Sequence, residues 1–83
     1  METIFDLIRY ERARQDAKWG IRHQHNMIWL SILTEEVGEV AKAILKKQWA
    51  QMNNELIQCA AVCVAWLEDN YSNEPKTDDW KAG

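Results

Sequence analysis

Residues that interrupt regular secondary structure are scarce in this chain, which has one proline and three glycines among 83 residues. Disordered and collagen-like chains are rich in these residues, whereas a hydrophobic share of 47% is typical of a chain that folds around a core. A chain of this length forms one domain and buries only a modest core. We therefore expect homo-oligomerisation to bury further apolar surface.

Positive charge is also in short supply, and the net charge is -3. Binding to a nucleic acid polymer needs an excess of Lys and Arg, so we do not expect that class of partner. No apolar run approaches the roughly 20 residues of a membrane span, and no N-terminal stretch has the pattern of a secretion signal. These absences predict a cytoplasmic protein that does not interact with membranes.

The sequence contains only two cysteines, Cys59 and Cys63. Their spacing of four places them on consecutive turns of one helix, where a disulfide would constrain nothing. A structural zinc site would need further ligands close by. We interpret both residues as small buried thiols, which suits a reducing compartment.

The hydrophobic periodicity predicts three helices, at about residues 3–19, 27–47 and 51–70, with a polar connection at 20–26. Thr3 and Asp6 have the spacing of a capping start for the first helix, and Asn26 can cap the second. The third helix is apolar all round between Cys59 and Leu67, so we expect a second subunit to cover it. The second helix carries an apolar stripe that should face a partner helix, made of Leu30, Leu33, Val37, Val40 and Ile44.

The predicted fold class is therefore all-α. We expect an antiparallel helical hairpin plus an N-terminal helix, completed into a four-helix-bundle-like core by homo-oligomerisation. Residues 1–71 form the single domain in this interpretation. Residues 72–83 form a tail that is either flexible or laid on a neighbouring subunit, and Trp80 makes the second arrangement possible.

Acidic side chains interrupt the apolar strips of both hairpin helices. Glu36 and Glu39 continue a strip with Trp29 and Ile32, and Glu35 lies four residues before Glu39. On the third helix, Glu55 and Gln58 share a face. With a turn near Gln48, the rise per residue puts Glu39 and Glu36 roughly 13 and 18 Å from the turn, and Glu55 and Gln58 roughly 10 and 15 Å.

The four side chains thus fall in one layer between the two helices. Buried carboxylates without cationic partners favour a metal, and oxygen ligands alone favour Mg²⁺, which commonly binds substrate phosphates as well. Mn²⁺ is a possible substitute. The simpler alternative is a surface acid patch on a helical bundle, and the pattern by itself leaves both open.

The stretch 33–41, which contains Glu35, Glu36 and Glu39, resembles the EExxE motif of MazG-like nucleotide pyrophosphohydrolases. Glu55 to Gln58 stands at the position of that family's ExxD motif, with Gln58 in place of the Asp. The run ERARQDAKWG at residues 11–20 also resembles the segment that precedes EExxE in a compact branch of the family. Together these segments span residues 11 to about 68.

The resemblance implies an all-α protein that assembles as a homodimer or homotetramer. Its activity would be the Mg²⁺-dependent hydrolysis of a nucleoside triphosphate to a monophosphate and pyrophosphate, with cleaning of the nucleotide pool as the implied role. Glu36, Glu39 and Glu55 would ligate metal, and the Gln58 carbonyl could do so with less charge. Glu35 would support a further metal or orient the attacking water, so Glu35, Glu36 and Glu39 are the catalytic candidates.

Four further residues are candidates for substrate binding. Lys18 and Arg22 could meet the triphosphate, and Trp19 and Trp29 could stack on a base, although such side chains more often solvate a surface or pack in a core. His23 and His25 are expected to be surface residues. Gln58 keeps a second function open, a catalytically weakened nucleotide-binding or regulatory module, and a purely structural helical oligomer is a third possibility.

Overall fold

The computed structural model describes residues 1–73 and confirms the all-helical prediction for them. Three helices follow one another: α1 (Ile4–Trp19), α2 (Asn26–Leu45) and α3 (Trp49–Ser72). The predicted bounds are within about two residues of these. The predicted tail lies, except for its first two residues, outside the described residues, as does Trp80.

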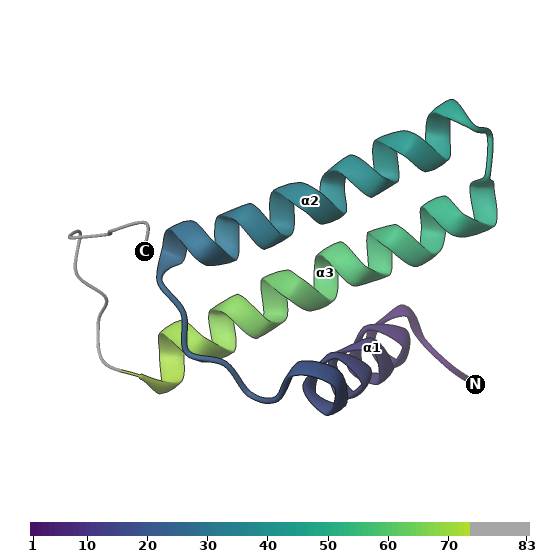
Figure 1. Cartoon of the computed structure of the whole chain (residues 1–83). Coiled ribbons are helices and arrows are strands. Elements are labelled where there is room, and N and C mark those ends of the chain that lie inside the picture. Colours follow the sequence, from purple (N-terminus) through teal and green to yellow (C-terminus); the bar gives the residue numbers. More distant parts are fainter. Residues whose placement is uncertain (74–83) are drawn as a thin grey trace.

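Helices α2 and α3 form the expected antiparallel hairpin, and α1 packs on the other side of α3 (Figure 1). The turn between α2 and α3 is tight, with Lys47 at a positive φ of 56° and the backbone N–H of Gln48 donating to the Ala43 carbonyl at 2.9 Å. Helix α1 begins with a complete capping box: Asp6 N–H donates to Thr3 Oγ1, and Thr3 N–H donates to Asp6 Oδ2. Since α1 touches α3 alone, α3 is the central element.

The core is small and lies between α2 and α3. It consists of the buried Trp29, Val62 and Ala65, with Ile32, Leu33 and Trp66 packed around them. None of the helices within residues 1–73 is long and apolar enough to cross a membrane.

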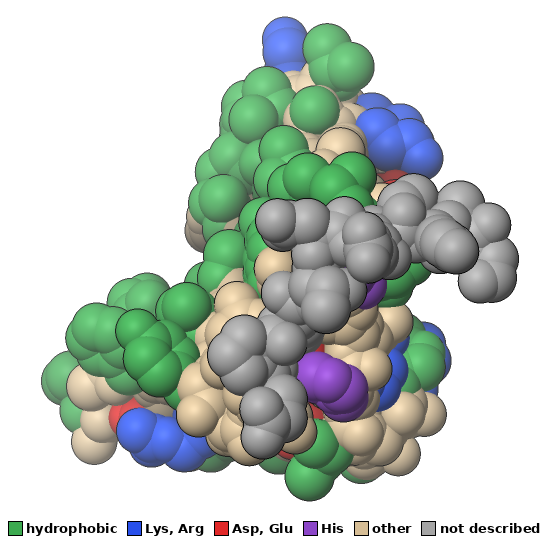
Figure 2. Space-filling model, turned by 90° about the vertical axis from the view of Figure 1, so that its left-hand side faces the viewer, with side chains coloured by type: hydrophobic (Ala, Val, Ile, Leu, Met, Phe, Trp, Pro, Cys, Tyr) green, Lys and Arg blue, Asp and Glu red, His purple; other side chains and the backbone are tan. Residues whose placement is uncertain are grey.

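The apolar stripe of α2 is covered only in part: Leu33 packs on the core, while other members of the stripe face away from α3. Leu30, Val37 and Ile44 are 43 to 53% exposed, because α3 packs instead against the neighbouring strip that contains Trp29, Glu36 and Ala43. Leu56, Cys63 and Leu67 of α3 are also exposed. Figure 2 shows hydrophobic side chains over the upper part of one face, at the height of α2, and again at its lower left, at the height of α1. The folded chain therefore leaves apolar surface open on several helices.

Candidate functional site

Two carboxylates meet between the hairpin helices, and we refer to them as the Glu36–Glu55 pair. Glu36 comes from α2, and Glu55 is 8% exposed on the facing stretch of α3. Gln51 Nε2 donates to Glu55 Oε1 at 2.7 Å. Among the described residues, Glu55 Oε2 and Glu36 Oε2 are buried without any hydrogen-bond partner. Of the four side chains expected in one layer between the helices, Glu36 and Glu55 meet there, whereas Glu39 is exposed and Gln58 lies toward α1.

The electrostatics of Glu36 reflect this proximity. Burial raises the pKa of Glu36, and the charge of Glu55 raises it further, as does a proton that the two carboxyl groups can share. Glu39 and Glu11 add smaller repulsive effects in the same direction. Burial and the charges of three carboxylates, one from each helix, therefore disfavour the anionic form of Glu36.

The remaining candidates for metal binding and catalysis, Glu35, Glu39 and Gln58, are more exposed than Glu55. Glu39 lies 3.6 Å from Lys42 Nζ in a solvent-exposed i,i+3 pair, and Glu35 is exposed on the same helix. Gln58 is half-buried and lines a hollow between α1 and α3. Thus Glu39 lies near the pair, while Glu35 faces solvent.

The two carboxylates of the pair are better suited to binding a hard cation than to lying buried without a ligand. A buried polar oxygen without a partner is destabilising, and two such oxygens on like-charged groups are more so. A divalent ion bound between them would supply both missing interactions. Within residues 1–73, however, no three His, Cys, Asp or Glu side chains are arranged to hold a metal by themselves. A metal here would complete its shell with water or with a ligand's oxygens.

The substrate-binding candidates gather at the other end of the hairpin. Lys18 Nζ lies 4.7 Å from the centre of the Trp19 ring, and the Arg22 guanidinium lies 5.4 Å from Trp19 and 5.3 Å from Trp29. Trp29 is only 2% exposed and belongs to the core. A base could stack on Trp29 only if its neighbours moved, whereas the half-exposed Trp19 is open to a ligand.

A second buried carboxylate, Asp69, lies at the same end of the hairpin as the substrate-binding candidates, and no sequence pattern predicted it. Its Oδ2 accepts from Trp29 Nε1 at 2.7 Å and from the Gln24 N–H at 3.0 Å, and its Oδ1 lies 2.6 Å from His23 Nδ1. Asn73 Nδ2 also donates to Oδ1 at 2.7 Å. We call these five residues the Asp69 cluster. It ties the connection between α1 and α2 to the end of α3.

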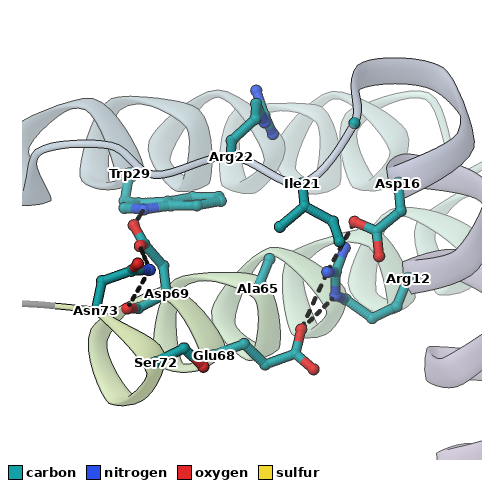
Figure 3. Close-up of a pocket in the computed structure, with 11 residues that line it drawn as sticks. Arg12, Asp16, Ile21, Arg22, Trp29, Ala65, Glu68, Asp69, Ser72 and Asn73 are labelled. Carbon is teal, nitrogen blue, oxygen red and sulfur yellow. Dashed lines mark hydrogen bonds and ion pairs between the residues drawn. The ribbon is translucent and has the colours of Figure 1, made fainter.

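A pocket of about 250 Å³ adjoins the Asp69 cluster (Figure 3). In this view Trp29 lies over Asp69, and Arg12 of α1 lies between Asp16 and Glu68. Arg12 Nη2 is 2.9 Å from Asp16 and 3.0 Å from Glu68, so its charge is already paired. The acids around this pocket are satisfied by protein donors, which makes it a structural junction between α1 and α3.

The start of α2 corrects one expectation from the sequence. Asn26 is not the cap but the first residue of the helix, and its Oδ1 accepts from Trp66 Nε1 at 2.9 Å. His25 caps α2 instead, since its Nδ1 accepts from the Met27 N–H at 3.1 Å. An imidazole nitrogen can serve as this acceptor when it is unprotonated.

Comparison with known proteins adds no relative: no protein-family model, no curated protein and no solved structure matches the chain.

Proposed function

We propose that this chain is a Mg²⁺-dependent nucleoside triphosphate pyrophosphohydrolase that resembles the MazG-like enzymes. It would convert a ribo- or deoxyribonucleoside triphosphate and water into the monophosphate and pyrophosphate. The observation that carries the proposal is the Glu36–Glu55 pair, in which each carboxylate has one buried oxygen that accepts no hydrogen bond from another residue of the described chain. When the two groups do not share a proton, a bound cation would relieve their repulsion.

The pair supports Mg²⁺ because of its ligand type and number. Magnesium is commonly held by one or two carboxylates, with waters and substrate phosphates in its other positions. Glu36 and Glu55 would supply these carboxylates, and Mn²⁺ could replace the ion. Glu39 and the Gln58 carbonyl would extend the ligand set when substrate is present.

The bound cation would offset the negative charge of the triphosphate and make a water molecule more acidic. Attack by this water on the α phosphorus would form a new P–O bond and release pyrophosphate as the bond to the bridging oxygen breaks. The exposed Glu35, on the same helix as Glu36, would orient the water and accept its proton. Trp19 is the candidate for base stacking that is accessible in the folded chain.

The open apolar stripe of α2 supports a homo-oligomer. Pairing the exposed Leu30, Val37 and Ile44 with the same face of a second chain would complete a four-helix-bundle-like core. Both a homodimer and a homotetramer are compatible with this surface. Two free cysteines suit a reducing environment, and we place the enzyme in the cytoplasm.

The test is pyrophosphate release from a panel of ribo- and deoxyribonucleoside triphosphates. We expect release with Mg²⁺, none with EDTA, and a loss of about 100-fold or more in Glu39→Gln, because a carboxylate beside the metal is removed. Glu68→Gln is the matched control, since Glu68 is an exposed acid outside the pair. Release that persists in EDTA would contradict the proposal, as would a Glu39→Gln variant as active as the control.

A nucleotide-binding module with little turnover is the second candidate, and Gln58 favours it. This residue brings no charge to the position where the ExxD motif has an acid, and its side chain lines a hollow shared with α1. The module would bind triphosphates without releasing pyrophosphate at an appreciable rate.

A further inference from the structure

A hollow of about 500 Å³ lies between α1 and α3, and we call it the α1–α3 hollow. It adjoins the Glu36–Glu55 pair, because Gln51 both lines the hollow and donates to Glu55. Its polar lining is rich in hydrogen-bond donors, namely Tyr10, Arg14, Gln51, Asn54 and Gln58.

The one acid among the described lining residues is already neutralised by protein groups. Glu11 accepts from Arg14 Nε at 2.8 Å and Nη2 at 2.6 Å, and from Gln15 Nε2 at 3.2 Å. The Arg14 hydrogen bonds hold the pKa of Glu11 below its ordinary value. The hollow therefore offers amide, phenol and guanidinium donors beside a carboxylate pair, which is the pattern that a metal-bound polyphosphate requires.

Arg14 is the basic residue of α1 that is placed to meet such a ligand. It is 51% exposed although it is paired, and Glu36 lies near enough to act on its charge. Arg12 is committed to Asp16 and Glu68, and Lys18 lies against Trp19. Arg9 pairs with Asp6, and neither residue lines the hollow.

We propose that the α1–α3 hollow receives the triphosphate of the substrate, and that Arg14 exchanges Glu11 for a phosphate oxygen when the nucleotide binds. This inference rests on the proposed function. A half-exposed ion pair within one helix contributes little to stability, so its exchange for a bidentate contact with a more highly charged phosphate is favourable. Arg14 thereby acts as a substrate-binding residue. The exchange leaves Glu11 with the neutral Gln15 as its donor, and the Mg²⁺ that accompanies the triphosphate would offset the repulsion between Glu11 and the phosphate.

The experiment compares Arg14→Gln with Arg9→Gln in the full chain. Arg9 is a close match because it forms the same i,i+3 pair on the same helix, with Asp6 at 2.9 Å, and is 72% exposed. We expect Arg14→Gln to raise KM for the preferred triphosphate about 10-fold or more, as loss of a hydrogen bond between charged groups does, with kcat within about threefold. Arg9→Gln should match the parent chain.

A binding experiment separates failure of this inference from failure of the proposed function. The probes are inorganic tripolyphosphate and a nucleoside triphosphate with a methylene group between the α and β phosphorus atoms. The affinity for each probe is measured by titration calorimetry in the presence of Mg²⁺. Arg14→Gln should bind both about 10-fold more weakly than Arg9→Gln. Thermal unfolding checks that both variants fold as the parent does.

Equal KM and equal affinities for Arg14→Gln and Arg9→Gln would overturn the role of Arg14 and leave the enzyme assignment standing. A parent chain that binds the probes but releases no pyrophosphate would refute the enzyme assignment alone, and the affinities would still decide the role of Arg14. If the parent chain binds neither probe, both proposals are wrong.

Discussion

The two ends of α3 each bury a carboxylate, and they differ in how its oxygens are satisfied. Asp69 is 4% exposed, and both of its oxygens accept hydrogen bonds from protein donors. Glu55 is 8% exposed, yet one of its oxygens has no partner in the described chain and a second carboxylate faces it. Burial is nearly equal, so burial alone does not distinguish a structural acid from a ligand-binding one.

This difference indicates that the two ends of α3 have different roles. The Asp69 cluster has its donors in place and gains nothing from a ligand, so its contribution is to the stability of the fold. Repulsion within the Glu36–Glu55 pair lowers the stability of the free protein, and a bound cation would raise it. We therefore assign the pair to ligand binding. Variants at the two ends should therefore have opposite effects on stability.

The largest expected effect on stability is at the Asp69 cluster. Asp69→Ala removes the acceptor for Trp29 Nε1, the Gln24 N–H and His23, and should lower the free energy of unfolding by about 3 kcal/mol. Urea denaturation at fixed protein concentration measures this. Glu68→Ala, at the neighbouring exposed acid, should cost less than about 1 kcal/mol. Equal losses in the two variants would contradict the structural role of the cluster.

A smaller effect of opposite sign is expected at the Glu36–Glu55 pair. In EDTA at pH 7, Glu36→Gln should raise Tm by roughly 4–8 °C, the shift that a gain of about 1 kcal/mol produces in a domain of this size. The reason is that a neutral amide avoids the burial of a charge and the repulsion by Glu55, which together raise the pKa of Glu36. With millimolar Mg²⁺ the order should reverse, because the ion stabilises the parent chain and not the variant.

The pH dependence of that difference follows from the sign of the pKa shift. A carboxyl group whose pKa is raised by folding binds its proton more tightly in the folded state, so folding becomes less favourable as pH rises through the raised pKa. The advantage of Glu36→Gln should therefore be present at pH 7 and disappear below the ordinary pKa of 4.5. If the difference in stability between Glu36→Gln and the parent chain did not depend on pH, the ionisation of Glu36 would not be its cause.

The smallest expected effect is at Gln58. If the enzyme assignment is correct, the amide carbonyl suffices, and Gln58→Asp should change the rate of pyrophosphate release by less than about threefold. Gln58→Asn is the control for the shorter side chain. A gain of about 10-fold or more in the Asp variant alone would favour the weakened nucleotide-binding module.

The sequence predicted the features that depend on local spacing. Helical periodicity located all three helices. The rise per residue put Glu36, Glu39, Glu55 and Gln58 in one layer, and of these four Glu36 and Glu55 lie close together in the structure. The Thr3 and Asp6 spacing corresponds to a complete capping box. Each of these rests on residues near one another along the chain, or on one hairpin register.

The remaining features depend on contacts that spacing does not encode. Asp69 is joined to His23 across 46 residues and to Trp29 across 40, so no motif marks the cluster. The hydrophobic stripe of α2 was expected to meet a partner helix, whereas α3 covers the neighbouring strip that carries Trp29 and Glu36. Arg14 was not distinguished from the other basic residues of the first helix, because only the packing of α1 on α3 places it in the hollow.

Binding of a divalent cation by the Glu36–Glu55 pair can be measured by direct titration with Mn²⁺. Free Mn²⁺ can be followed by electron paramagnetic resonance as the ion is added to the parent chain, Glu55→Gln and Glu68→Gln. We expect binding by the parent chain and by Glu68→Gln, competition by Mg²⁺, and a loss of affinity of about 10-fold or more in Glu55→Gln. Binding that is equal in all three proteins, or absent from the parent chain both with and without a triphosphate, would contradict this expectation.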